Sequence, residues 1–256
     1  MLSRLLLRLA AFSLILMPMM GIDAHAAVKP QPRAAARAGA ARPAARPGAV
    51  DWTRTVTVTP IGSFILGNPN AKTKLVEYMS YSCPHCADFA AEATTQLKTG
   101  WVKGGSLSIE YRNFIRDGYD LSAALIARCG GTSHFLANHE LIFSTYDGWM
   151  DQAQKYAQSH SDASGGDNGA QFIDIADKVG LTAVAVKNGI SEQAAHQCLA
   201  DPKALATILA LTSGAWDVDR NFEGTPTFLL NGEVLHGIHS WEGLKPRLPP
   251  LPASGK

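Results

Sequence analysis

The segment Lys74 to Ala93, KLVEYMSYSCPHCADFAAEA, limits the possible folds of this chain more than any other. Cys83 and Cys86 are two residues apart, between a short apolar run and an alanine-rich run with helical spacing. Such runs predict a buried strand followed by a helix. Because residues 106–115, SLSIEYRNFI, alternate as in a second strand, the segment predicts a βαβ unit with both cysteines at its first strand–helix junction.

The second half of the chain predicts a different organisation. Residues 119–220 contain several helical stretches, and TPTFLLNGEVLHG then reads as two strands joined by a tight Asn231-Gly232 turn. A short helix is expected from Ser240. The predicted α/β architecture is therefore a βαβ half, a helical insertion at about 118–220 and a ββα half.

The N-terminal residues predict export. Arg4 and Arg8 precede or interrupt an apolar run that ends near Met20, and small residues follow. We interpret residues 1–26 as a cleaved signal peptide, because the uninterrupted apolar stretch is shorter than a bilayer span. After cleavage no stable membrane insertion is expected. The Ala/Pro/Arg-rich residues 27–50 are expected to form a disordered linker, and residues 51–256 the folded domain.

Cys83 is the expected nucleophile of the pair, since cysteine attacks only as a thiolate. At a helix start, unpaired N–H groups and the helix dipole favour a negatively charged sulfur. Pro84 suits the first helical turn, and a protonated His85 adds positive charge. In such settings thiol pKa values lie at roughly 3.5 to 7.5, against about 8.5 for free cysteine.

A stabilised thiolate favours the reduced form of the pair, so the disulfide form is an oxidant. Cys86, one helical turn inward, is expected to be more buried and to act as the resolving thiol. A zinc site needs about four ligands, and the pair supplies two with no second close pair in the sequence. A purely structural bridge would close a very small loop and stabilise little. We therefore expect a reactive redox pair with no metal and no organic cofactor.

Four features together resemble the DsbA-like thioredoxin-fold disulfide oxidoreductases of the bacterial envelope. They are the EYMSYSCPHC segment, the helical insertion, GTPTFLLNG at 224–232 and the signal peptide. The resemblance covers about residues 60–247 and implies a thioredoxin fold. It also implies a cis proline at Pro226 facing the cysteines, with the backbone of Thr225 pairing with a substrate strand. The alternative is that Pro226 merely starts a strand.

Glu77 lies in the strand that is expected to be buried, where a carboxylate is costly without a partner or a function. The resemblance implies that this acid lies beneath the cysteine pair and assists proton movement at Cys86. The alternative is an exposed position on an edge strand.

Cys129 and Cys198 lie in the predicted helical insertion. In an oxidising compartment a second disulfide between them is the simplest use, and it would add roughly 4 kcal/mol in the chain-entropy model. Two separate buried thiols are the alternative.

The resulting hypothesis is a periplasmic oxidoreductase that donates the Cys83–Cys86 disulfide to reduced or unfolded exported proteins. The resemblance implies a quinone-linked membrane partner for reoxidation. Net charge near zero argues against nucleic-acid binding. CPHC resembles the oxidase branch, whereas a threonine before the cis proline resembles isomerases and reductases. A disulfide isomerase or reductase therefore remains the close alternative, and a non-catalytic thiol-dependent chaperone or metal carrier a more distant one.

Overall fold

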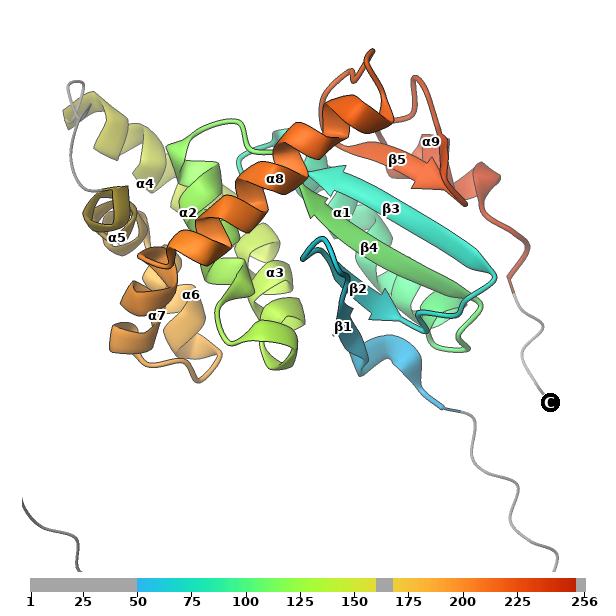
Figure 1. The fold of residues 1–256 in the computed structure, drawn as a ribbon, viewed down its shortest axis with the longest axis horizontal. Coiled ribbons are helices and arrows are strands. Elements are labelled where there is room, and N and C mark those ends of the chain that lie inside the picture. The colour runs from blue at the N-terminus through green and yellow to red at the C-terminus, as the bar shows by residue number, and fades with distance from the viewer. Residues whose placement is uncertain (1–49, 160–167, 252–256) are drawn as a thin grey trace, which may run out of the picture. The chain divides into compact units, whose positions relative to one another are not determined.

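The computed structural model of this chain describes residues 50–159 and 168–251 (Figure 1). The expected signal peptide and nearly all of the expected linker lie outside the described residues. The same holds for most of SHSDASGGDNG, residues 159–169, whose composition predicts a loop between helices.

The described strands form one mixed sheet with the order β1-β2-β4-β3-β5-β6. Their bounds are β1 Val56–Val58, β2 Phe64–Gly67, β3 Thr73–Met79, β4 Leu107–Asn113, β5 Thr227–Leu230 and β6 Glu233–Val234. The α-helices are α1 Pro84–Leu97, α2 Gly118–Arg128, α3 Phe135–Ser144, α4 Tyr146–Ser159, α5 Asn168–Val179, α6 Leu181–Lys187, α7 Glu192–Leu199, α8 Pro202–Val218 and α9 Trp241–Leu244. Short 3-10 turns occupy Trp52–Arg54, Gly131–Ser133 and Lys245–Arg247, and a π turn occupies Lys98–Val102.

The pairing of the central strands confirms the predicted fold class. β3 and β4 are parallel and α1 connects them, which makes the βαβ half. β5 pairs antiparallel with β3 on its other side, and β6 and α9 complete the ββα half. Helices α2 to α8 are inserted between β4 and β5 and gather beside the sheet (Figure 1).

Helix α1 begins where the sequence predicts. Cys83 has an extended backbone and is the N-cap residue, and Pro84 takes the first helical position, where its missing N–H costs nothing. Phe89, Ala93 and Leu97 are buried along one side of the helix. Their spacing of four residues forms a single apolar stripe that packs toward the sheet.

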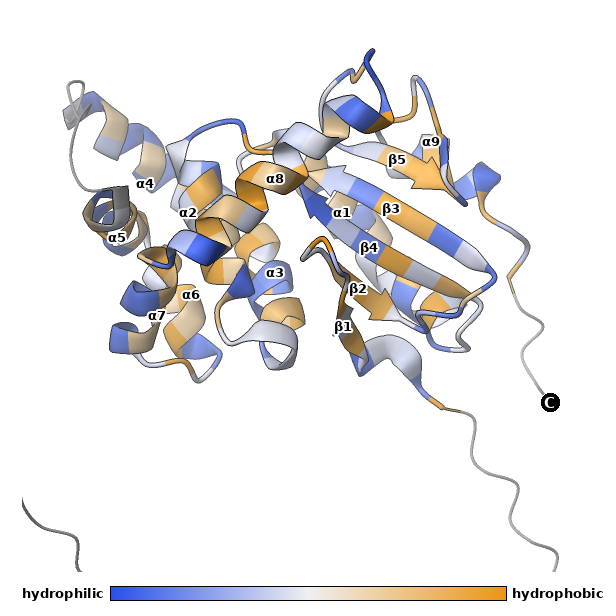
Figure 2. Ribbon diagram, viewed as in Figure 1, coloured by the Kyte–Doolittle hydropathy of each residue, from blue (hydrophilic) through white to orange (hydrophobic). Residues whose placement is uncertain are grey.

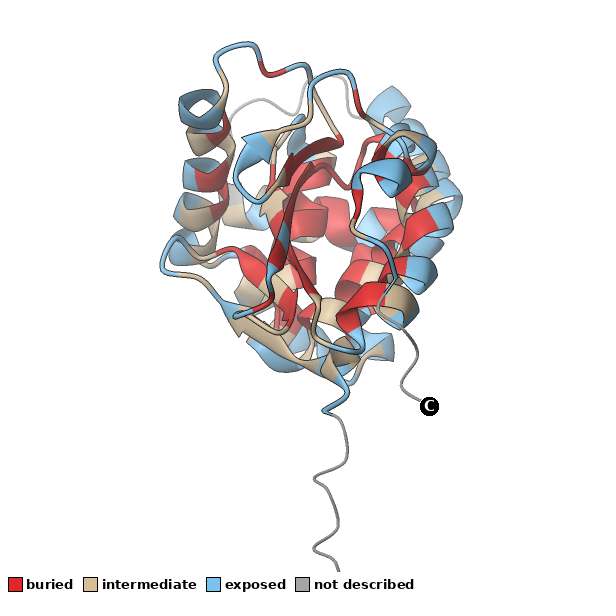
Figure 3. Ribbon diagram, turned by 90° about the vertical axis from the view of Figure 1, so that its right-hand side faces the viewer, coloured by how far each residue is buried: buried red, intermediate tan, exposed pale blue. Residues whose placement is uncertain are grey.

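The two faces of β3 pack against different helices because side chains alternate along a strand. Leu75 and Met79 join the large core that contains α1, whereas Val76 and Tyr78 join a smaller cluster with Ala215 of α8. Helix α8 is apolar along its middle and runs from the inserted helices to the sheet (Figure 2). The buried residues accordingly gather along the strands and the helix surfaces that face them (Figure 3).

Within the described residues, none of the helices combines the length and the apolar character that crossing a bilayer requires. The residues GSFILGNPNA at 62–71 predict a further short strand, where β2 lies, but the sequence does not predict β1 at the sheet edge. Its three residues are half-buried or exposed, so they carry little of the apolar pattern that marks the interior strands.

Candidate active site

The cysteine pair lies at the carboxyl edge of the central parallel strands. β3 ends at Met79, and a short turn follows in which the Cys83 N–H donates to the Ser80 carbonyl over 3.3 Å. Cys83 keeps 4% of its surface exposed, Cys86 is fully buried, and both are free thiols. Burial of the second cysteine leaves Cys83 as the sulfur that an incoming group reaches.

Pro84 and His85 are both exposed at the start of α1. With Cys83 they line a cavity of about 280 Å³, which we name the entrance cavity. Its other lining residues are Phe114, Arg116, Gly224 and Thr225. The structure therefore brings the predicted residues of the CPHC motif and Thr225 together around one opening.

The pKa of Cys83 is lowered to about 5. The largest cause is a hydrogen bond from the Cys86 thiol, supported by the Thr225 side chain, the Cys86 backbone N–H and the positive charge of Arg116. Burial acts in the opposite direction. The Cys83 thiol also lies 3.2 Å from the Thr225 carbonyl oxygen, to which it donates. That bond favours the thiol, and the contacts that favour the thiolate outweigh it.

The sequence interpretation of this pKa relied on the helix start and His85. It did not anticipate the contributions of the Thr225 side chain and Arg116, because both depend on tertiary contacts.

The pKa values of Cys86 and Glu77 are raised, whereas that of Cys83 is lowered. Burial raises the pKa of Cys86 well above its ordinary value, and the interactions with Cys83 and Glu77 add to this. Burial also raises the pKa of Glu77 to about 8. Glu77 is 4% exposed and lies on the same face of β3 as Leu75 and Met79, toward α1. At neutral pH its carboxyl group is therefore mostly protonated, close enough to Cys86 to affect its ionisation.

The loop before β5 places Thr225 and Pro226 opposite the cysteines. The peptide bond between these two residues is cis, and the Thr225 carbonyl reaches Cys83. His239, for which the sequence gave no role, has its Nδ1 2.8 Å from the Pro226 carbonyl oxygen and its Nε2 3.0 Å from Glu223. His239 thus ties this loop to the segment before α9.

A second set of contacts ties the cysteine turn to the inserted helices. The buried Asp120 carboxylate accepts hydrogen bonds from the backbone N–H groups of Tyr81, at 2.7 Å, and Arg116, at 3.0 Å. The Ser82 carbonyl accepts from Arg116 Nη1 and the Tyr146 hydroxyl, each at 3.2 Å. These contacts fix the backbone immediately before Cys83.

Sequence reasoning missed both Arg116 and Asp120, although one signal was available. Arg116 follows β4, and the carboxyl ends of parallel strands meet at one edge of a sheet. Residues directly after β4 were therefore candidates for the neighbourhood of the cysteine pair.

Cys129 and Cys198 are joined in the structure, with their sulfur atoms 1.98 Å apart and Cα atoms 5.5 Å apart. The bridge links the end of α2 to α7 across 69 residues of sequence. It lies within the inserted helices, and neither cysteine lines the entrance cavity.

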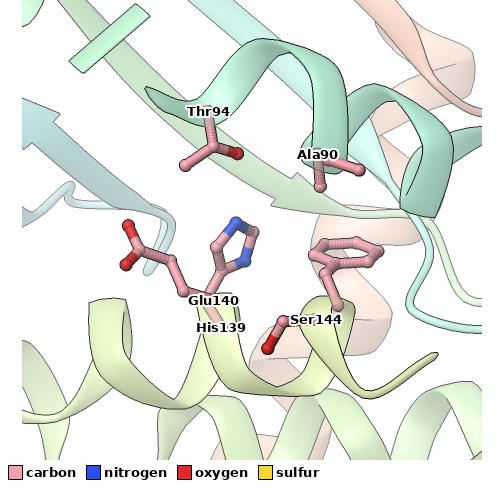
Figure 4. Close-up of a pocket in the computed structure, with 7 residues that line it drawn as sticks. Ala90, Thr94, His139, Glu140 and Ser144 are labelled. Atoms are coloured by element: carbon pink, nitrogen blue, oxygen red, sulfur yellow. The ribbon is translucent and has the colours of Figure 1, made fainter. Parts of the chain in front are cut away.

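A separate cavity of about 380 Å³ lies between α1 and α3 (Figure 4). Its lining residues are Ala90, Ala91, Thr94, His139, Glu140, Phe143 and Ser144. The His139 ring extends from α3 toward α1 (Figure 4). The Tyr81 hydroxyl lies 3.0 Å from the Nδ1 atom of His139. Burial lowers the pKa of His139 to about 3, so this ring is neutral. None of the residues predicted for redox chemistry lines this cavity, which we assign to the packing between the two helices.

Comparison with known proteins agrees with the fold of this chain. A family model described as thioredoxin matches residues 59–248. A crystal structure of a protein named protein-disulfide isomerase from Novosphingobium aromaticivorans is 33% identical, with a TM-score of 0.67, and the match covers 72% of this chain and 93% of that one. The α-DsbA1 protein of Wolbachia pipientis is 19% identical with a TM-score of 0.58 over 74% of this chain and 90% of that one, a likeness of fold.

Curated relatives carry a similar name. Proteins named as protein-disulfide oxidoreductases in Rickettsia bellii and Rickettsia conorii are 29% and 31% identical over 169 residues. Each match covers 66% of this chain but only 56% and 53% of the relative. The matched part of this chain thus spans about half the length of the curated relatives.

Proposed function

The chain belongs to the thioredoxin family, and from that membership we propose that it is an exported thiol:disulfide oxidoreductase that donates its Cys83–Cys86 disulfide to other proteins. The substrates are reduced or unfolded exported proteins, and the place of action is the periplasm. The observation that carries the proposal is the contrast within the pair: the pKa of Cys83 is lowered to about 5, whereas that of Cys86 is raised well above its ordinary value.

The contrast in pKa between the two cysteines supports electron flow from the substrate to the pair. A stabilised Cys83 thiolate favours the reduced pair, so the oxidised pair readily accepts two electrons from a substrate dithiol. The same low pKa makes the Cys83 sulfur a good leaving group. Both properties serve a disulfide donor.

The reaction begins when a substrate thiolate attacks the sulfur of Cys83. A bond forms between the substrate and Cys83, the Cys83–Cys86 bond breaks, and Cys86 leaves as a thiolate. The second substrate thiolate then attacks the substrate sulfur of this mixed disulfide, and Cys83 leaves as a thiolate. The substrate loses two electrons and gains a disulfide, and the enzyme pair becomes reduced.

Glu77 supplies the proton that this first step requires. The departing Cys86 thiolate lies in a buried site that disfavours charge. Glu77 is mostly protonated at neutral pH, since its pKa is raised to about 8, and it is near enough to interact with Cys86. Transfer of its proton to Cys86 places no lasting charge on the buried sulfur. The Glu77 carboxylate that remains regains its proton from solvent.

Thr225 and Pro226 hold the substrate during the exchange. Thr225 lines the entrance cavity beside Cys83, so an extended substrate segment that pairs with its backbone brings a cysteine next to the reactive sulfur. Reoxidation of the reduced pair requires an electron acceptor, for which we propose a quinone-linked membrane partner. The Cys129–Cys198 bridge has a structural role in this proposal, and no metal or organic cofactor takes part.

Equilibration of the pair with reduced and oxidised glutathione tests the proposed direction. A disulfide donor is expected to have a reduction potential near the about −120 mV of strong oxidants, far above the about −270 mV of thioredoxin. Cys83→Ser is the control that removes the pair while leaving Cys129 and Cys198 in place. A potential close to that of thioredoxin would overturn the assignment as a donor.

A disulfide isomerase is the second candidate, and two observations favour it. The relative from Novosphingobium aromaticivorans carries that name, and a threonine precedes the cis proline here. An isomerase works from its reduced form. In that case the enzyme should restore activity to scrambled ribonuclease faster than it oxidises fully reduced ribonuclease. A non-catalytic chaperone or metal carrier predicts instead that Cys83→Ser loses little activity.

A further inference from the structure

The entrance cavity has one wall that the proposed chemistry does not use. Its lining comes from three segments: Gly224 and Thr225 before β5, the start of α1, and a wall formed by Phe114 and Arg116 after β4. Phe114 and Arg116 belong to the segment after β4, so they come from the opposite flank of Cys83 to the cis-proline loop. A substrate segment that pairs with Thr225 therefore has its side chains near this wall.

Arg116 holds a positive charge at a fixed place in this wall. Its Nη1 donates to the Ser82 carbonyl at 3.2 Å, and its backbone N–H donates to the buried Asp120 carboxylate at 3.0 Å. The residue is exposed, and no ion pair within the described ranges 50–159 and 168–251 engages it. Its charge is thus held beside Cys83 and left open toward solvent.

The acidic side chains next in sequence to Arg116 and to Gly224 already bind other groups of the protein. Asp117 accepts hydrogen bonds from the Ser82 hydroxyl and the Asp120 backbone N–H at the start of α2. Glu223 lies 3.0 Å from His239 and accepts from the Gly237 backbone N–H. Neither carboxylate lines the entrance cavity, so the charge that a bound segment meets there is positive.

Phe114 makes the neighbourhood of Arg116 less polar. Its ring stacks on Phe222 with centroids 4.5 Å apart and meets Trp216 of α8 at 5.8 Å. Trp216 remains 48% exposed, so the aromatic surface continues outward from the cavity. Charges that meet beside an apolar surface are less well screened than charges that meet in open water.

We propose that Arg116 is a specificity-determining residue that selects substrate segments with an acidic side chain next to the reactive cysteine. The inference rests on the proposed function and names the substrate class of the same site. The bound substrate is an extended, reduced segment. Its carboxylate pairs with the Arg116 guanidinium while its cysteine lies next to Cys83. The complementary charge speeds association and holds the register of the segment.

The test compares two reduced dithiol peptides of equal length that differ only by Glu or Gln beside the attacking cysteine. The oxidised full-length protein is mixed with each peptide, and the second-order rate constant of peptide oxidation is divided by that peptide's rate constant with a neutral small-molecule disulfide. This division removes the effect of the neighbouring charge on the peptide's own thiol. The unaltered protein is expected to favour the Glu peptide by roughly two- to fivefold at low salt, the range of an exposed ion pair.

Three variants locate the effect. Arg116→Gln should bring the normalised ratio close to one, and Arg116→Lys, which keeps the charge, should keep the preference. Arg116→Glu should reverse it and favour a peptide with Lys at the same position. Lys74→Gln is the matched control, because it removes an exposed positive charge near the start of β3, five residues or about 17 Å of strand from Met79. It should leave the ratio unchanged.

Two further readouts separate selection from a general loss of reactivity. Arg116→Gln should raise the pKa of Cys83, which slows or speeds both peptides alike and cancels in the ratio. Salt near 1 M, where the Debye length is about 3 Å, should abolish the preference of the unaltered protein without any substitution.

A ratio of one for the unaltered protein at low salt, with both peptides oxidised, overturns the role of Arg116 alone. Failure to oxidise either peptide overturns the proposed function itself.

Discussion

At the scale of single residues, Glu77 is the position in the site whose burial most needs an explanation. A buried carboxyl group costs free energy unless it is neutral, paired or useful. Burial raises the pKa of Glu77 to about 8, and no hydrogen bond within the described parts of the chain engages its side chain. A glutamine would fill the same space without any titration, so the acid is best explained by the proton it can release.

Glu77→Gln is therefore expected to slow the first exchange step by about tenfold, a modest share of the usual effect of general acids. In the unaltered protein the rate, divided by the ionised fraction of the substrate thiol, should fall as pH rises through about 8, because the protonated form of Glu77 is the donor. The variant should lose this dependence. Stopped-flow measurement of substrate oxidation between pH 6 and 9 records both effects.

Glu92→Gln provides the matched control, since it makes the same chemical change at an exposed position on α1. Its rate and pH profile should match those of the unaltered protein. An unchanged pH profile in Glu77→Gln would remove the proton-transfer role from Glu77.

At the scale of elements, the turn between β3 and α1 is fixed by hydrogen bonds to α2. Asp120 in the first turn of α2 bonds the backbone N–H groups of Tyr81 and Arg116, and it is fully buried. One helix thereby positions both the residues that precede Cys83 and the arginine beside it.

Asp120→Ala is expected to destabilise the protein by about 1–3 kcal/mol, because it leaves the buried Tyr81 backbone N–H and the part-buried Arg116 backbone N–H without their acceptor. It should also raise the pKa of Cys83, since the turn and Arg116 lose their fixed positions. Chemical denaturation and ultraviolet absorbance of the thiolate measure the two effects.

Asp201→Ala is the comparison, because Asp201 also caps a helix by accepting from a backbone N–H, that of Lys203, at 2.8 Å. It should cost about 1 kcal/mol and leave the Cys83 pKa unchanged. Equal effects of both variants on that pKa would show that the position of the turn does not depend on Asp120.

The Cys129–Cys198 bridge fixes α7 to the end of α2. Replacement of both cysteines by alanine is expected to lower the free energy of unfolding by about 4 kcal/mol, as the chain-entropy model gives for a loop of this length. Denaturant titration measures the loss, and the glutathione equilibrium of the Cys83–Cys86 pair should not change. A shift in that equilibrium would mean that the inserted helices transmit strain to the redox pair.

The elements that sequence reasoning located are those with strong local signals. Alternation, helical spacing, Pro84 at a helix start and the Asn231-Gly232 turn are read within a few residues, and β3, α1, β4 and the β5–β6 hairpin lie where they were expected. β1 was missed because a short edge strand buries little.

Arg116 and Asp120 were missed for a different reason. Their roles depend on packing between the inserted helices and the sheet, and no local pattern encodes that packing. The same limit explains why the lowered pKa of Cys83 was anticipated while two of its causes were not.

At the scale of the whole molecule, two buried carboxyl groups make stability depend on pH. Burial raises the pKa of Glu77 to about 8 and that of Asp120 to about 7. Both values exceed those of the unfolded chain, so the folded state holds these protons more tightly. Their contribution is full below about pH 4 and is lost as pH rises through 7 and 8.

The free energy of unfolding of the oxidised protein, in which Cys83 and Cys86 do not titrate, should therefore fall between pH 5 and 8. Each group contributes up to about 1.4 kcal/mol per pH unit. Glu77→Gln should flatten the curve and stabilise the protein at pH 8, whereas Glu92→Gln should keep the original slope. Urea titrations at four pH values are sufficient, and a curve that rises over this range would refute the burial argument.

The pairing of β3 with β5 joins residues that lie far apart in the chain, with Leu75 opposite Leu230. During synthesis from the N-terminus, more than half of the chain must therefore be made after β3 before β5 can pair with it. The Thr225 contacts with Cys83 arrive in that same late segment. Full sulfur reactivity is consequently a property of the finished molecule, because a nascent chain lacks the Thr225 contribution to the lowered pKa of Cys83 until synthesis is nearly complete.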